Sequence, residues 1–242
     1  MSRRFPTVAE VAAAYRPRLA NELKTEWAIA VLYRPVSLMI TPLFAAVGAT
    51  PTAVSLLGLA IALALPFVAA AAGAQAWVTV GVLAIAFCVL DCVDGDLARV
   101  TGRSSARGAY LDFVVDLAYR AGFYAAAGVA ADAARDASGI AALGGDGGVV
   151  AGLACALVAI LARACRLYVE GGGHGADRPQ SQAGISGGEV ATAFLSGLDH
   201  LLPVAVLVLG ALGRLDWAIA WLVVYSLGDF VQTQAAVWKR LA

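Results

Sequence analysis

Long apolar stretches alternate with short polar connections along most of the chain. An α-helix needs about 20 mainly apolar residues to cross the hydrocarbon core of a membrane. Thr50 followed by Pro51 is typical of a helix N-cap with proline at the first helical position, so the first membrane helix is predicted to begin there. The six stretches predicted to span the membrane are residues 52–73, 76–101, 106–133, 147–171, 186–212 and 215–238.

The segment before the first of these stretches is less regular. Residues 22–49 are interrupted by Pro35 and Pro42. They predict one or two amphipathic helices lying at the membrane interface, and a seventh membrane-spanning helix is the alternative. We therefore expect an all-α polytopic membrane protein with six transmembrane helices preceded by an N-terminal amphipathic juxtamembrane helix. Residues 1–49 would form the interfacial segment and residues 50–242 the transmembrane domain.

The composition agrees with a membrane protein and excludes some functions. The chain is 61% hydrophobic and 14% charged, whereas soluble domains contain about 25% charged residues. A formal net charge of zero provides no basic surface for nucleic-acid binding. The four cysteines show no C-x-x-C zinc framework.

Charges in the connections predict how the chain is oriented in the membrane. Cations gather in the leading segment, in every second connection and at the end of the chain, and the opposite connections contain few of them. By the positive-inside rule, both termini are expected in the cytoplasm, which requires an even number of spans. The cations on the predicted cytoplasmic side are Arg3, Arg4, Arg16, Arg18, Lys24, Arg34, Arg103, Arg107, Arg178, Lys239 and Arg240.

An aspartate cluster lies in the second and third apolar stretches. Five of the chain's twelve aspartates fall within residues 91–116. Carboxylates at membrane depth are costly and normally mark a functional site. The short G-R-S-S connection predicts a helical hairpin that places Asp94 opposite Asp112 and Asp91 opposite Asp116. Asp96 is expected to point away from these four, because successive helical residues are rotated by about 100°.

Four neighbouring carboxylates indicate a bound cation. They would repel one another unless a divalent ion compensates their charge. An all-oxygen site suits Mg²⁺, Mn²⁺ or Ca²⁺ rather than zinc, and two metals would suit phosphoryl transfer. Arg99 lies close by and would bind a phosphate group through two hydrogen bonds. Gly95, Ala98 and Gly108 would allow either close helix packing or close approach of a ligand.

These residues match the signature D-x2-D-G-x2-A-R-x8-G-x3-D-x3-D, through which the chain resembles the CDP-alcohol phosphotransferase family. The match is complete in residue type and spacing. The six-span layout with a leading amphipathic helix is also similar to the family. Thr50-Pro51-Thr52 departs from the T-P-N of many members, since Thr52 replaces the asparagine. The matched positions are Asp91, Asp94, Gly95, Ala98, Arg99, Gly108, Asp112 and Asp116.

The resemblance implies a metal-dependent transferase in the cell membrane. The charges of the connections predict that its active site faces the cytoplasm. Such an enzyme moves a substituted phosphate from a CDP-alcohol to an acceptor hydroxyl and releases CMP, and the family is usually dimeric. Asp116 would act as the base on the acceptor hydroxyl. Two Mg²⁺ or Mn²⁺ ions would be held by Asp91, Asp94, Asp112 and Asp116. The CDP group would contact Gly95, Ala98, Arg99 and Gly108.

The donor and acceptor are less closely defined by the sequence. Family members that use a phosphorylated polyol often have Arg or Lys after the last motif aspartate, where this chain has Leu117. Arg120 is a candidate acceptor contact or a partner for the carboxylates. Arg163 and Arg166 are further acceptor candidates, or else they extend to the membrane interface. We expect CDP-diacylglycerol as donor, with a soluble CDP-polyol or CDP-aminoalcohol and a lipid acceptor as the alternative.

A cation or proton transporter is the competing class, because it would also place carboxylates within the membrane. It would not require Gly, Ala and Arg at these spacings. The other intramembrane ionisable residues are Asp199, His200 and Asp229. We expect them to form helix-packing hydrogen bonds or to contact the acceptor.

Overall fold

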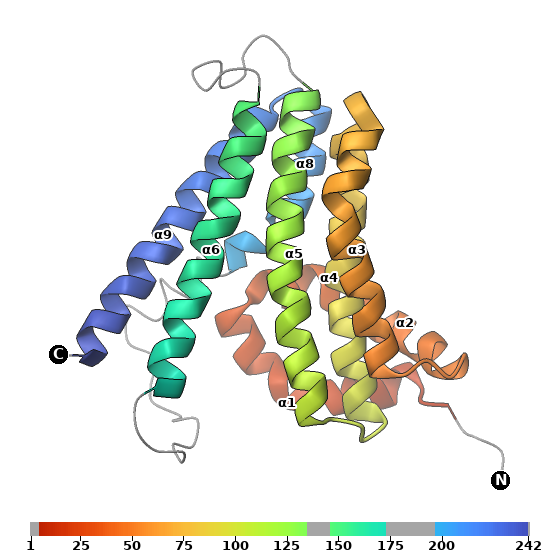
Figure 1. Cartoon of the computed structure of the whole chain (residues 1–242). Coiled ribbons are helices and arrows are strands. Elements are labelled where there is room, and N and C mark those ends of the chain that lie inside the picture. Colours follow the sequence, from red (N-terminus) through yellow and green to blue (C-terminus); the bar gives the residue numbers. More distant parts are fainter. Residues whose placement is uncertain (1–4, 135–145, 173–196, 242) are drawn as a thin grey trace.

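The computed structural model describes residues 5–134, 146–172 and 197–241. All regular secondary structure within these residues is helical, and the long helices form an elongated bundle (Figure 1). The elements are α1 (Val8–Thr25), the π-helical turn η1 (Ile29–Tyr33), α2 (Arg34–Ala46), α3 (Pro51–Ala72), the 3₁₀ turn η2 (Gly73–Gln75), α4 (Ala76–Val100), α5 (Ala106–Ala133), α6 (Gly147–Gly172), α8 (Leu202–Ala211) and α9 (Leu215–Leu241).

Local sequence signals set several helix boundaries. Thr50 caps α3 by accepting a hydrogen bond from the Ala53 amide, and Pro51 takes the first helical position, as predicted. Ser105 caps α5 in the same way through the Gly108 amide. The turn between α4 and α5 includes Gly102, whose φ of 65° lies in the left-handed region that glycine adopts without strain. The helical hairpin predicted around the aspartates is therefore confirmed.

Small residues allow the long helices to approach closely. A Cβ atom on Gly122 of α5 would collide with the Ala62 carbonyl of α3. Gly128 of α5 and Gly148 of α6 lie backbone to backbone in the same way. Such contacts are typical of membrane helices, which gain stability from close packing rather than from the exclusion of water. Helix α5 thus packs between α3 and α6 (Figure 1).

The predicted fifth span differs from the structure, because its described part is not one continuous helix. Its first residues, 186–196, lie outside the described residues, as do Arg3, Arg4 and Arg178. In the described part, a turn at His200 and Leu201 precedes α8. Pro203 explains the interruption, because it has no N–H to donate to the carbonyl four residues earlier. The other predicted spans agree with α3, α4, α5, α6 and α9 to within three residues at each end.

Several helices are long and apolar enough to cross a membrane. They occupy Ile29–Ala46, Gly147–Tyr168 and Pro51–Val100, and the last of these ranges contains both α3 and α4. Gly197–Ala211 is a shorter apolar helical stretch. Charged residues dilute the hydropathy of α5 and α9, so the count of six spans stays a prediction.

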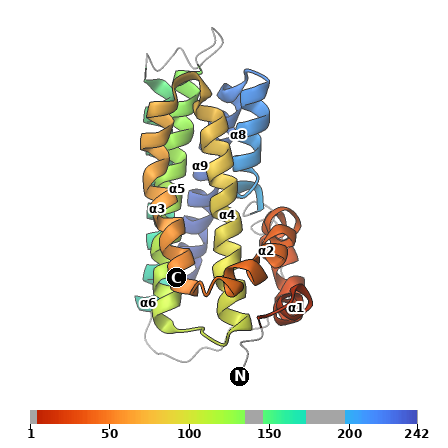
Figure 2. The same ribbon diagram turned by 90° about the vertical axis from the view of Figure 1, so that its right-hand side faces the viewer.

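Helices α1 and α2 occupy the region expected to lie at the interface. Both run across one end of the bundle rather than along it (Figures 1 and 2). Thr7 and Glu10 form a capping box that starts α1. Ile29–Ala46 is apolar enough to span, so a seventh span remains the alternative on composition alone.

Candidate active site

Three carboxylates converge where α4 packs against α5. Side-chain oxygens of Asp91 and Asp94 on α4 and of Asp112 on α5 all lie within 4.8 Å of one another. Asp94 is buried and accepts a 2.6 Å hydrogen bond from the Ser55 hydroxyl of α3, whereas Asp112 is exposed. The hairpin register inferred from the sequence thus brings these three predicted ligands together.

Asp116, the fourth predicted ligand, lies beside this group rather than within it. Its carboxylate is 3.5 Å from the Arg120 Nε and 3.9 Å from an Arg163 guanidinium nitrogen. Asp116 and Asp91 both line a small cavity of about 30 Å³, which is room for about one water molecule. The first and the last aspartate of the motif, Asp91 and Asp116, therefore lie next to the same cavity.

The donor atoms of the three clustered aspartates suit a hard divalent cation. Oxygen is the preferred ligand of Mg²⁺ and Ca²⁺ and is common for Mn²⁺. Among the described residues, no Arg or Lys forms an ion pair with Asp91, Asp94 or Asp112. Their mutual repulsion is therefore not offset by a directly bound side-chain cation, and a metal ion would offset it.

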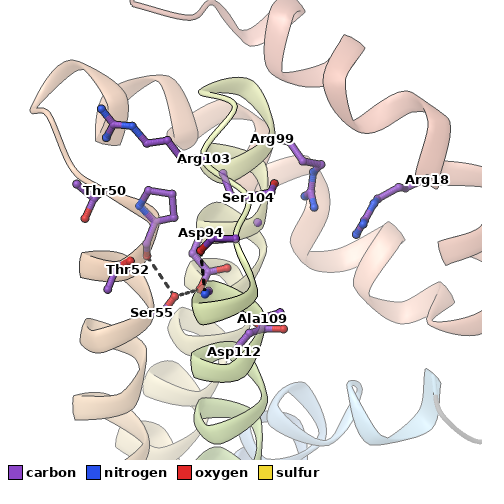
Figure 3. Close-up of a pocket in the computed structure, with 15 residues that line it drawn as sticks. Arg18, Thr50, Thr52, Ser55, Asp94, Arg99, Arg103, Ser104, Ala109 and Asp112 are labelled. Atoms are coloured by element: carbon purple, nitrogen blue, oxygen red, sulfur yellow. Dashed lines mark hydrogen bonds between the residues drawn. The ribbon is translucent and has the colours of Figure 1, made fainter. Parts of the chain in front are cut away.

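A pocket of about 460 Å³ opens next to Asp94 and Asp112. Figure 3 shows Thr50, Thr52 and Ser55 on one side of it and Arg18 and Arg99 on another. The pocket is large enough for a nucleotide-sized ligand. All four residues expected to contact the CDP group line it, namely Gly95, Ala98, Arg99 and Gly108.

The motif glycine at position 95 has a specific packing role. A Cβ atom there would lie 3.1 Å from Nη1 and 3.2 Å from Nη2 of Arg99. Glycine therefore lets the Arg99 guanidinium fold back over the surface of α4. A Cβ atom on Gly108 would meet only the Ser105 hydroxyl within 4 Å, at 3.4 Å, so this position leaves the pocket wall open rather than serving a helix contact.

Two cations of the pocket were not expected as ligand contacts. Arg18 projects from α1, and Arg103 follows α4; both line the pocket together with Arg99. Neither Arg18 nor Arg103 forms an ion pair with any described residue. In the sequence, Arg18 and Arg103 indicated only the orientation of the chain in the membrane.

The three candidate acceptor arginines differ in their surroundings. Arg120 donates a 2.5 Å hydrogen bond to Asp199, which also accepts one from Tyr124. Arg120 also lies 3.5 Å from the motif carboxylate of Asp116, so it is a carboxylate partner, and its contact with the acceptor stays a prediction. Arg163 lies over the Phe113 ring at 5.4 Å, and its Nε is buried without a hydrogen-bond partner in the described structure.

Arg166 is held between α6 and α9. It donates to both carboxylate oxygens of Asp229, at 2.9 and 3.2 Å, and to the Thr233 hydroxyl at 2.5 Å. The interhelical hydrogen bonds expected for Asp229 and Asp199 are thus present. Near Asp199, the His200 backbone carbonyl accepts a 2.6 Å hydrogen bond from Tyr33.

Comparison with known proteins agrees with this site. A search of curated proteins finds no match. The family model for CDP-alcohol phosphatidyltransferase matches residues 48–224, which is well over half of the chain and includes every motif residue. On this match, and with the motif carboxylates gathered beside a pocket lined by arginines, the chain belongs to the CDP-alcohol phosphatidyltransferase family.

Proposed function

We propose that the chain is an integral-membrane transferase of phospholipid biosynthesis that uses CDP-diacylglycerol as donor and a small polar alcohol as acceptor. The observation that carries this proposal is the convergence of Asp91, Asp94 and Asp112 beside the large pocket. A cation transporter would need the carboxylates, but it would not need a nucleotide-sized pocket lined by arginines.

The metal would be held by Asp91, Asp94 and Asp112, with Asp116 completing a two-ion site of Mg²⁺ or Mn²⁺. When bound, the metal supplies positive charge to the pyrophosphate of the donor. Ser55 fixes one oxygen of Asp94 through its 2.6 Å hydrogen bond. The remaining steps belong to the side chains of the protein.

Arg99, together with Arg18 and Arg103, would bind the CDP group in the large pocket. Guanidinium groups suit phosphate oxygens because they donate several hydrogen bonds in a fixed plane. Gly95 and Gly108 leave room for Arg99 and for the ligand, respectively. Together these residues would orient the β-phosphorus toward Asp116.

Asp116 would accept the proton of the acceptor hydroxyl. The acceptor oxygen then forms a bond to the β-phosphorus while the bond from that phosphorus to the bridging oxygen breaks, and CMP leaves with the electron pair. A base at this point needs to lie within about 2.6–3.2 Å of the hydroxyl. Arg120 and Arg163 orient the Asp116 carboxylate, and the partly exposed guanidinium of Arg163 would contact the acceptor.

We also propose that the protein is a homodimer in the cell membrane, with both termini and the active site on the cytoplasmic side. The cation-rich connections support this orientation. The C-terminal end of α9 and helix α1 lie toward the same end of the bundle as the turn between α4 and α5 (Figure 1). The transverse course of α1 and α2 supports an interfacial position for them (Figure 2).

The experiment is CMP release by detergent-purified protein with Mg²⁺ or Mn²⁺. CDP-diacylglycerol and soluble CDP-alcohols would each be offered with polar and lipid acceptors. Asp116→Asn tests the base, and Asp216→Asn is the matched control at the far end of α9. CMP release from CDP-diacylglycerol that is lost in Asp116→Asn supports the proposal. If CMP is released only from a soluble CDP-alcohol, that compound replaces CDP-diacylglycerol as the proposed donor. If the protein binds neither CDP nor metal, the proposal of a transferase is wrong.

A further inference from the structure

A buried ionic cluster joins α1 and α2 to the back of the motif helix. It consists of Glu22, Arg34, Ser37 and Asp96, whose relative exposures are 7%, 9%, 0% and 1%. Asp96 lies between motif residues in sequence but outside the metal cluster, as its helical position predicts. Burying ionisable groups this deeply lowers the stability of the protein unless each charge is paired.

Asp96 is the centre of the cluster. Its carboxylate accepts hydrogen bonds from Arg34 at 3.2 Å, from the Ser37 hydroxyl at 2.9 Å and from Arg99 Nη2 at 2.6 Å. Two of these partners come from α2, and the third is the arginine expected to bind the donor. The position of Asp96 therefore connects α2 directly to a pocket residue.

Arg34 connects the cluster to α1. Besides its hydrogen bond to Asp96, it donates three to Glu22, at 2.9 to 3.1 Å, and one to the Cys92 carbonyl at 3.3 Å. Its guanidinium also lies 4.5 Å from the centre of the Tyr15 ring. Burial and the charge of Glu22 raise the pKa of Tyr15 to about 12, so the ring stays neutral beside the cation.

Arg99 is held by Asp96 and also lines the large pocket. Asp96 fixes Nη2, and the missing side chain of Gly95 provides the space for the guanidinium. Its Nε is buried without a partner in the described structure, and the side chain lines the pocket near Arg18 (Figure 3). A cation held in place before binding loses less conformational freedom when a phosphate arrives.

We propose that Asp96 is a positioning residue that holds Arg99 ready for the CDP group, and that Arg34 and Glu22 hold Asp96 in turn. Helices α1 and α2 would then be functional parts of the donor site rather than membrane anchors only. This inference rests on the proposed function, because it assigns Arg99 to the donor. Counted together with Arg99, this network holds two arginines and two carboxylates, and Arg34 pairs with both Glu22 and Asp96. Asp96 is therefore shared between Arg34 and Arg99, and Arg99 is the one of the two that lines the pocket.

The test is a double-mutant cycle with Asp96→Asn and Arg99→Gln, read by donor KM, acceptor KM, kcat and the calorimetric Kd for CDP with Mn²⁺. Asp96→Asn is expected to weaken CDP binding and raise donor KM by about tenfold, with kcat and acceptor KM changed by less than about twofold. In the Arg99→Gln background it should have almost no further effect, because it acts through Arg99. Asp132→Asn, which loses one of the two carboxylate oxygens that cap α6, controls for destabilisation alone.

Ser37→Ala provides a milder variant if Asp96→Asn fails to fold, since it removes one of three hydrogen bonds to Asp96. A CDP affinity lowered about threefold is then expected, again only when Arg99 is present. The same loss in both backgrounds, or a loss of thermal stability without any change in CDP affinity, would overturn the proposal. Intact CDP binding without CMP release from any donor would instead count against the proposed function, because the binding measurements do not require turnover.

Discussion

Replacing Asp112 by Asn is expected to stabilise the metal-free protein and to abolish its response to metal. Asp112 forms no hydrogen bond or ion pair with any described residue, so the substitution removes charge without removing a native contact. It also keeps the size of the side chain. The two effects have opposite signs, which separates a metal site from an ordinary structural cluster.

The magnitude follows from the spacing of the carboxylates. At 4.8 Å, each ionised pair would repel by about 3.5 kcal/mol at an effective dielectric constant of about 20. Asp112→Asn removes two of the three pairs, but Asp112 is exposed and water screens much of the repulsion. We therefore expect a net gain of about 1–3 kcal/mol, or about 2–12 °C in Tm for a chain of this size.

The assay is thermal unfolding of detergent-purified protein in EDTA and in Mg²⁺ or Mn²⁺. At a metal concentration of about 100 times Kd, the wild-type protein should gain about 2.7 kcal/mol. Asp112→Asn should melt higher than wild type in EDTA and gain little from metal. Asp216→Asn, which loses only an exposed pair with Arg214, should keep the full metal response. A variant that melts lower in EDTA and keeps that response would refute the metal-site reasoning.

Three further predictions address the base, the pocket and the helix packing. Asp116→Asn should lower CMP release at least 100-fold while CDP still binds, as calorimetry would check; a kcat within a few-fold of wild type would exclude this base. Arg18→Gln should raise donor KM by about tenfold, whereas Arg16→Gln on the same helix, outside the pocket lining, should not; equal effects would indicate general electrostatics. Gly122→Ala should lower stability by about 1–3 kcal/mol in thermal unfolding, because its Cβ would collide with the Ala62 carbonyl; an unchanged Tm would mean that α3 and α5 separate easily.

The helices were largely predictable because their signals are local. Apolar length, the Thr50-Pro51 cap and the short connection before Ala106 each depend on neighbouring residues, and α3, α4 and α5 begin within one residue of the expected positions. The break before α8 was missed because the apolar run continues through it. Pro203 was its signal, since proline removes a backbone donor while leaving the hydropathy almost unchanged.

The carboxylate cluster was predictable for a different reason. The helical period and the loop length together determine which residues of a hairpin face each other, so Asp91, Asp94 and Asp112 could be paired from spacing. Contacts between helices that are distant in the sequence cannot be predicted from spacing in this way. The pairing of Arg166 with Asp229, 63 residues away, and the reach of Arg18 into the pocket depend on how separate helices pack.

Helix α4 carries aspartates on two faces, and the two faces differ in whether a cationic side chain pairs with them. Asp96 is fully paired by α2 and Arg99. Paired groups account for their own burial and do not require a ligand. Asp94, like the other clustered aspartates Asp91 and Asp112, has no ion pair with a described Arg or Lys and accepts a hydrogen bond from the neutral Ser55 hydroxyl. The unbalanced charge is therefore confined to the face beside the pocket, and that is where a bound cation would stabilise the protein most.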